Sequence, residues 1–293
     1  MKISISDVLK EYLDNDNVLF HYTKLRTGIE NILKDRKLKF GDISKFSDLR
    51  EKIFIQPMFV PTPNGFTTDI NKINDIDKQV TNQIENYKCL CFCTNKQIVE
   101  GVDVNSYVYL LNRVLPQEME IIKILKGYQK DRMWDQYSDG FEGFCFVFDK
   151  SIFIDDIEKN LSYKIINQGN VNYSEDPRHQ LSLLNLNEVS EKEADDNLKQ
   201  KFFVKHYDYK EENEYRILIK SQKGNDDFID VSKSMKAVIV GPSFPEIYYN
   251  VVKEKLYELN SIRNCNNVKL LKYYMTRVGD SIEEVELSQS YKS

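Results

Sequence analysis

Two charged residues on one predicted strand are the first candidates for chemistry in this sequence. Residues 205–220 read KHYDYKEENEYRILIK, and polar and apolar residues alternate from Glu214 onward. This alternation predicts a β-strand with Glu214 and Arg216 on the same face. A guanidinium lowers the pKa of a neighbouring carboxyl group and keeps it ionised. The pair is therefore either a solvated ion pair on an edge strand or a catalytic carboxylate with its supporting cation.

Three cysteines are the most conspicuous metal candidates. Cys89, Cys91 and Cys93 occupy alternate positions of a predicted strand, so their sulfurs share one face at roughly 6–7 Å per step. A zinc site needs four converging ligands, which usually come in CxxC pairs. The three histidines of the chain are isolated in sequence. We therefore predict that these thiols bind no metal and pack as small apolar groups.

A polar and aromatic segment, MWDQY at residues 133–137, is another candidate. At helical spacing, Trp134 and Tyr137 are either core residues or a stacking wall for a base or a pyridine ring. Gly140 and Gly143 follow, and glycine permits a tight turn or the close approach of a ligand.

His21 lies at the end of a short predicted strand, followed by Tyr22 and Thr23. A histidine at such a boundary is either a hydrogen-bonded structural residue or a donor to a ligand, here a sugar hydroxyl. The sequence pattern alone leaves both roles open.

The composition indicates a folded chain with a sizeable core. Of its 293 residues, 41% are hydrophobic, and the net charge of -5 gives no global basic field for nucleic acid, although a local basic groove stays possible. No apolar run approaches the roughly 20 residues that cross a membrane. The start lacks the pattern of a signal peptide. With five cysteines, we expect reduced thiols and a cytoplasmic protein without a membrane segment.

The expected elements mix strands and helices without a regular βαβ order, which favours an α+β fold. We expect a single α+β domain over residues 1–293, with a helical insertion at about 97–130 and a loose tail after Arg277. The glycine patterns of the common nucleotide-binding folds are absent from the sequence. Expected strands lie at residues 18–22, 38–40, 89–93, 144–148, 163–173, 214–219, 237–240 and 268–274, and a late helix lies at 246–259.

Taken in order, five short motifs resemble a bacterial domain-of-unknown-function family, the one numbered 2971. The resemblance extends from about His21 to Gly241. The sequence departs from the family pattern at Ser47 and Leu49, where the family has Asn and Pro, and at Phe141, where it has His. The motifs are His21-Tyr22-Thr23, Ser47-Asp48-Leu49-Arg50-Glu51, Cys91-Phe92-Cys93, Met133-Trp134-Asp135-Gln136-Tyr137 and Glu214-Tyr215-Arg216.

The layout of that family is similar to the ADP-ribosyltransferase fold, with small, twisted, mostly antiparallel sheets flanked by helices. This similarity rests on pattern and fold alone. It implies that the motif His21-Tyr22-Thr23 binds NAD and that His21 donates a hydrogen bond to the adenosine ribose. Tyr22, Trp134 or Tyr137 would then form a wall beside the nicotinamide.

The same resemblance gives Glu214 the central role in catalysis. Glu214 would stabilise the oxocarbenium-like state as the nicotinamide–ribose bond breaks, as carboxylates do in glycoside hydrolysis. Arg216 would keep Glu214 ionised or bind a phosphate. Glu212 and Glu214 also form the Glu-x-Glu pattern of arginine-modifying enzymes. The resemblance further implies that His21, the 134–137 region and Glu214 line one concave pocket.

The implied function is an NAD-dependent ADP-ribosyltransferase that modifies an unknown protein or nucleic-acid acceptor, as a toxin or phage-defence effector. Two alternatives stay open. One is a non-catalytic nucleotide- or nucleic-acid-binding module, in which aromatic residues and Lys199, Lys201 and Lys205 form a groove with a basic rim. The other is an RNA-directed nuclease with His21 and Glu214 as its acid–base pair.

Overall fold

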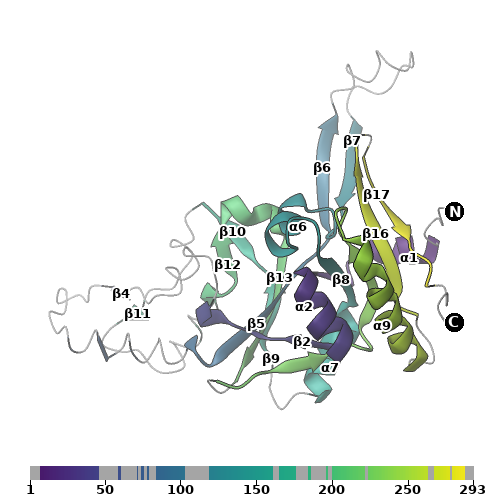
Figure 1. Cartoon of the computed structure of the whole chain (residues 1–293). Helices are drawn as coiled ribbons and strands as arrows, with labels where there is room; N and C mark the ends of the chain where they lie inside the picture. Colours follow the sequence, from purple (N-terminus) through teal and green to yellow (C-terminus); the bar gives the residue numbers. More distant parts are fainter. Residues whose placement is uncertain are drawn as a thin grey trace.

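One large sheet organises the computed structural model (Figure 1). Its strands follow the order β17-β16-β15-β8-β1-β5-β13-β9, and β3 pairs with β5. Within this sheet β15 and β16 are parallel, and the other described pairs are antiparallel. The expected α+β class is therefore confirmed. The structure describes residues 7–45, 59–60, 71, 74–75, 78, 84–102, 119–160, 165–175, 184–185, 196, 200–221, 224–262, 267–277 and 279–287.

Short strand pairs and helices surround this sheet. The sheet strands are β1 (Val18–Thr23), β3 (Gly41–Asp42), β5 (Tyr87–Cys93), β8 (Phe144–Asp149), β9 (Ile165–Asn170), β13 (Glu214–Lys220), β15 (Met235–Val240), β16 (Lys269–Thr276) and β17 (Gly279–Glu284). The remaining pairs are β2 (Lys37–Lys39) with β14 (Phe228–Asp230), β4 (Phe59–Val60) with β11 (Leu184–Asn185), β6 (Lys96–Val102) with β7 (Met119–Leu125), and β10 (Asn172–Ser174) with β12 (Val204–His206). The helices are α1 (Asp7–Leu13), α2 (Leu25–Thr27), the π-helix η1 (Gly28–Leu33), α6 (Asp131–Tyr137), α7 (Lys150–Asn160), α9 (Tyr249–Ile262) and the 3-10 helices η2 (Ile43–Lys45), η4 (Tyr207–Glu212) and η5 (Glu246–Tyr248).

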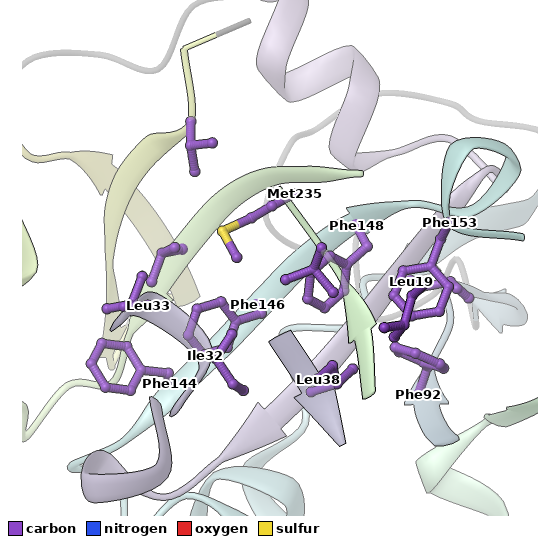
Figure 2. Packing of buried hydrophobic residues seen from close by; sticks show 14 of the residues in the cluster. Leu19, Ile32, Leu33, Leu38, Phe92, Phe144, Phe146, Phe148, Phe153 and Met235 are labelled. Carbon is purple, nitrogen blue, oxygen red and sulfur yellow. The ribbon is translucent and has the colours of Figure 1, made fainter. Parts of the chain in front are cut away.

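The strand β8 shows why the apolar run of the sequence lies at the centre. It reads FCFVFD, and it pairs with β1 on one side and β15 on the other. A strand that is covered on both faces needs apolar residues at every position rather than at alternate ones. Phe144, Phe146 and Phe148 point to one face, where Figure 2 shows them packed with Leu33 and Met235.

The two faces of the sheet carry different cores. On the first face, residues of η1, α7 and α9 pack over Phe92, Phe146 and Ile217. On the second face, residues of α1 and α6 pack over Phe20 and Cys145. Both cores lie within the described residues, and together they hold the sheet between two helical layers.

The sheet is joined only narrowly between β1 and β5. These two strands share the single register pair Phe20↔Cys93, whereas β1 and β8 share six pairs and β5 and β13 share seven. Beyond this pair, the ring of His21 approaches β5, and its Nδ1 lies 3.0 Å from the carbonyl oxygen of Cys91. The sheet thus consists of two mostly antiparallel parts that meet beside the predicted site residues.

Two expectations about local structure are wrong. In the segment expected as a helical insertion, residues 96–102 and 119–125 form the antiparallel strands β6 and β7, and Figure 1 shows this ribbon extending away from the main sheet. Residues 103–118 lie outside the described part of the chain. After Arg277, the expected loose tail contains β17, which pairs along β16. A short segment such as MEIIKIL of β7 fits either a strand or about two turns of helix, so periodicity alone does not separate the two.

Candidate functional site: a buried carboxylate pair

The conformation of Asn213 brings two carboxylates together. The 3-10 helix η4 ends at Glu212, and β13 begins at Glu214. Between them, Asn213 adopts the left-handed conformation, with φ 42° and ψ 57°. Asn tolerates this conformation better than most side chains because its short amide forms local hydrogen bonds. The turn therefore directs both glutamates toward the same buried cation.

That cation is Lys205, at the centre of β12. Its Nζ donates to Oε2 of Glu212 at 2.7 Å and lies 3.3 Å from Oε2 of Glu214. Arg216 holds Glu214 from the other side with two parallel hydrogen bonds, from Nε at 2.7 Å and from Nη2 at 2.9 Å. Its Nη1 donates to the carbonyl oxygen of Phe202 at 2.7 Å. Such a two-point contact fixes the plane of the Glu214 carboxylate.

All four charged side chains are buried. Glu214 is 6% exposed and Arg216 is 2% exposed, so the pair is not the solvated ion pair of an edge strand. Lys205 is buried as well, and therefore it forms no basic rim for nucleic acid. One atom of the cluster remains unsatisfied, because Oε1 of Glu212 is buried without a hydrogen-bond partner in the described part of the chain.

The pKa values of the two carboxylates are shifted in opposite directions. Burial alone would raise the pKa of Glu214, but Arg216 and Lys205 together lower the pKa to about 2. For Glu212, burial raises the pKa above its usual value, and Lys205 offsets this only in part, while the charge of Glu214 adds to it. Glu214 is thus held as an anion, whereas Glu212 is closer to accepting a proton.

Tyrosines surround the carboxylates. Tyr137 in α6 is 39% exposed, and burial followed by the charge of Glu212 raises its pKa. The hydroxyl of Tyr173 in β10 accepts a hydrogen bond from the backbone N–H of Glu214 at 2.9 Å. The ring of Tyr209 lies 4.6 Å from Nζ of Lys205. The cluster therefore combines a buried ionic centre with partly exposed aromatic residues.

The prediction that His21 and Glu214 line one site is wrong. Glu214 pairs with Cys93, which in turn pairs with Phe20, and residues paired in this way share a face. His21 follows Phe20 in the strand and points to the opposite face, where its ring packs against Phe92 with ring centroids 5.7 Å apart. Burial lowers the pKa of His21. Thr23 also points to the face of His21 by the alternation of β1.

Tyr22 and Trp134 share the face of Glu214 but lie inside the core. Their rings meet edge to face, with centroids 5.0 Å apart. The hydroxyl of Tyr22 donates to the carbonyl oxygen of Gly127 at 2.8 Å, and Nε1 of Trp134 donates to that of Tyr128 at 2.8 Å. Trp134 is fully buried. Of the predicted aromatic wall, Tyr137 is the residue that lies beside the carboxylates and reaches solvent.

The cysteines share one face of β5, as expected. The sulfurs of Cys89 and Cys91 are 3.9 Å apart, closer than regular strand spacing predicts. Burial raises the pKa of the Cys93 thiol, and the hydrogen bond with Cys89, followed by burial, raises that of Cys91. Within the described residues, no group of three or more His, Cys, Asp and Glu side chains is placed to hold a metal ion.

Two contacts of this site have no signal in the sequence. The hydroxyl of Tyr173 contacts the backbone of Glu214, and the guanidinium of Arg132 stacks over Tyr209 at 4.3 Å. Both contacts join residues from different elements, so no local pattern indicates them. The expected motif Ser47-Asp48-Leu49-Arg50-Glu51 lies outside the described residues.

Residues 133–217 match a family of unknown function. The family is described as "Protein of unknown function (DUF2971)", and the matched segment runs from the third residue of α6 into the first half of β13. It contains Trp134, Tyr137, Glu214 and Arg216, whereas His21 lies outside it. The match covers less than half of the chain, and it supports the resemblance for this segment. No curated protein and no solved structure matches the chain.

Proposed function

We propose that the chain is an NAD-dependent ADP-ribosyltransferase whose chemistry is centred on Glu214 and Glu212. The observation that carries the proposal is the pair of carboxylates on one lysine, with the pKa of Glu214 lowered and that of Glu212 raised. Paired carboxylates whose environments separate their pKa values are a common basis for acid–base assignments. The mostly antiparallel sheet, narrowly joined between β1 and β5, supports the implied layout of small, mostly antiparallel sheets.

Each carboxylate has a distinct part in the reaction. As the bond between nicotinamide and C1 of the ribose breaks, the bonding electrons leave with nicotinamide and positive charge develops on the ribose. The anion of Glu214 stabilises this charge, and Arg216 keeps it ionised and correctly oriented. As nicotinamide leaves, the nucleophilic atom of the acceptor, or of water where no acceptor is present, bonds to C1, and Glu212 takes the proton that this atom loses.

Tyr137 supplies the aromatic surface for the nicotinamide ring. It lies next to both carboxylates and is 39% exposed, whereas Tyr22 and Trp134 serve as core residues. The proposal gives no catalytic part to His21, because its side chain lies on the other face of the sheet. For the same reason, an RNA nuclease with His21 and Glu214 as a cooperating pair is not favoured.

The test is a measurement of nicotinamide release from NAD by the purified protein. Glu212→Gln removes the proton acceptor while retaining the size of the side chain, so we expect the rate to fall by roughly two orders of magnitude. The matched control is Glu211→Gln. Glu211 is the preceding residue in η4, but its side chain is exposed and contacts Lys96 at 3.4 Å.

We expect Glu211→Gln to release nicotinamide at the wild-type rate. Radiolabelled NAD, incubated with protein and RNA acceptors, would then show which class of molecule receives ADP-ribose. An absence of nicotinamide release by folded wild-type protein, with every acceptor class tested, would overturn the proposal. Equal rates for Glu212→Gln and Glu211→Gln would remove the assigned role of Glu212.

A further inference from the structure

Asn213 has an unusual backbone position for a residue with a side chain. Among the described residues, the non-glycine residues with positive φ are Arg36, Asp139, Phe141 and Asn213. This conformation is uncommon outside glycine, and it persists where surrounding contacts enforce it. Asn213 lies between Glu212 and Glu214 in the chain. The contacts that enforce its conformation therefore also fix the backbone from which both carboxylate side chains start.

The amide of Asn213 supplies these contacts. Its Nδ2 donates to the carbonyl oxygen of Thr94 at 3.2 Å, to Oγ1 of Thr94 at 2.8 Å and to the carbonyl oxygen of Asn95 at 2.8 Å. In return, the backbone N–H and the hydroxyl of Thr94 both donate hydrogen bonds to the carbonyl oxygen of Asn213, each at 3.1 Å. Asn213 and the segment Thr94–Asn95 thus each donate to and accept from the other, and we call this set of hydrogen bonds the Asn213 clasp.

The other end of this clasp is anchored at the base of the β6–β7 ribbon. Asn95 immediately precedes β6, and its Oδ1 accepts a hydrogen bond from the N–H of Gly127 at 2.9 Å, just beyond β7. Its Nδ2 donates to the carbonyl oxygen of Leu13 in α1 at 2.9 Å. The segment Thr94–Asn95 is therefore itself held by hydrogen bonds to α1 and to the chain just after β7, so it forms a fixed support for Asn213.

We infer that Asn213 is a positioning residue, which sets the placement of Glu212 and Glu214 through its clasp on Thr94 and Asn95. The inference rests on the proposed function of the two carboxylates. It adds a requirement that the carboxylates themselves do not show, namely that their geometry depends on a neutral amide. A misplacement of about 1 Å costs on the order of 100-fold in rate when reacting groups must be aligned.

The central variant is Asn213→Gly. Glycine retains the left-handed backbone at no steric cost but removes all the amide contacts. We expect kcat for nicotinamide release to fall by roughly 10- to 100-fold, with little change in KM, because alignment rather than binding is lost. The limb of the pH–rate profile that belongs to Glu212 should move to lower pH, since a displaced Glu212 becomes more solvated.

The matched control is Arg36→Gly, which changes another left-handed residue, located next to the separate β2–β14 pair. It should leave kcat and the pH profile as in the wild type. Thr94→Val removes the hydroxyl of the clasp, and its effect should be less than additive with that of Asn213→Gly, because both substitutions break the same contacts. Circular dichroism confirms that each variant is folded.

A folded Asn213→Gly protein with wild-type kcat and an unchanged pH profile would overturn the inference. If the wild-type protein releases no nicotinamide, the proposed function fails separately. The inference is then decided by carbon-13 NMR titration of Glu212. A lowered pKa of Glu212 in Asn213→Gly, but not in Arg36→Gly, supports it, and an identical titration in all three proteins overturns it.

Discussion

Two buried lysines near opposite ends of β5 have different surroundings. Lys88 lies near the start of the strand, is 1% exposed and contacts the carboxylate of fully buried Asp227 and the carbonyl oxygen of Asn225. Lys205 lies beyond the end of β5, close to Cys93, and contacts both Glu212 and Glu214. Buried charges require such partners because their desolvation is costly.

The difference lies in what surrounds each pair. Lys88 and Asp227 are buried, and the second carboxylate near Nζ of Lys88 is that of Asp42 at 3.9 Å. Aromatic residues that reach solvent, Tyr137 and Tyr173, lie beside the Lys205 cluster instead. Burial of a charge is therefore not by itself a sign of function, but burial next to aromatic residues that reach solvent is a reason to test for it.

The strongest test of this comparison is Glu214→Gln. We expect turnover of NAD to fall by roughly two to four orders of magnitude, since the anion acts mainly in the transition state. The free energy of unfolding should also fall by roughly 3–5 kcal/mol, because Arg216 is left as a buried cation without its carboxylate. A solvated ion pair, one of the two roles that the sequence leaves open, would contribute little to stability, and the burial of Glu214 and Arg216 excludes that role.

The two effects of Glu214→Gln are separated by measuring nicotinamide release and urea unfolding on the same samples. Activity is expressed per folded molecule, at a temperature where the variant remains native. Wild-type activity per folded molecule would make the Glu214 cluster equivalent to the Lys88 pair, and it would end the catalytic assignment.

Lys88→Met tests the other side of the comparison. We expect the free energy of unfolding to fall by roughly 3–5 kcal/mol, because Asp227 loses its buried cation. Turnover per folded molecule should not change. The control is Lys39→Met, which breaks the exposed contact with Asp226 and should leave the free energy of unfolding nearly unchanged. A loss of turnover in folded Lys88→Met would contradict the structural role of this pair.

Acid titration of stability gives a smaller effect. The pKa of Glu214 is lowered from 4.5 to about 2 in the folded state. Between these values the unfolded state binds more protons than the folded state, so the free energy of unfolding decreases as the pH is lowered. The contribution is fully present above about pH 4.5 and is lost toward pH 2. The shift corresponds to a contribution on the order of 3 kcal/mol.

This contribution is isolated as a difference between two proteins. The unfolding free energy of wild type minus that of Glu214→Gln, measured by urea titration, should shrink as the pH falls through the window. A difference that stays constant down to pH 2 would mean that Glu214 is not held as an anion by its neighbours.

The smallest expected effect is that of Tyr137→Ala. Stacking of one ring on a base contributes roughly 1–3 kcal/mol, so the KM for NAD should rise on the order of tenfold while kcat changes little. Tyr137→Phe should behave like the wild type. Tyr257→Ala is the control, because this tyrosine is 51% exposed on α9, a helix of the other face. Equal KM values for Tyr137→Ala and Tyr257→Ala would exclude a stacking role.

Much of the sheet follows from local patterns. The alternation after Glu214 predicts β13, and the apolar run at 144–148 predicts β8, because a strand's burial dictates its residue period. The ribbon of β6 and β7 was missed because the segment MEIIKIL fits a helix as well, and its pairing partner lies at residues 96–102. Strand pairing over such distances leaves no local signal.

The site was predictable only in part. The spacing of Glu214 and Arg216 places them on one face, and the structure agrees. Whether His21 shares that face depends on the register of two pairings, β1 with β5 and β5 with β13. A shift of one residue in either would reverse the answer, and no motif order contains this information.

The pairing of β5 with β13 also dictates an order of events during synthesis. One edge of β5 is complete only when residues 214–220 have been made, more than a hundred residues after Cys93. At ribosomal speed this interval is on the order of ten seconds. Through that time β5 presents unpaired backbone groups and apolar side chains such as Leu90 and Phe92, a combination that favours aggregation. The nascent chain is therefore expected to depend on chaperones until the strand that contains Glu214 emerges.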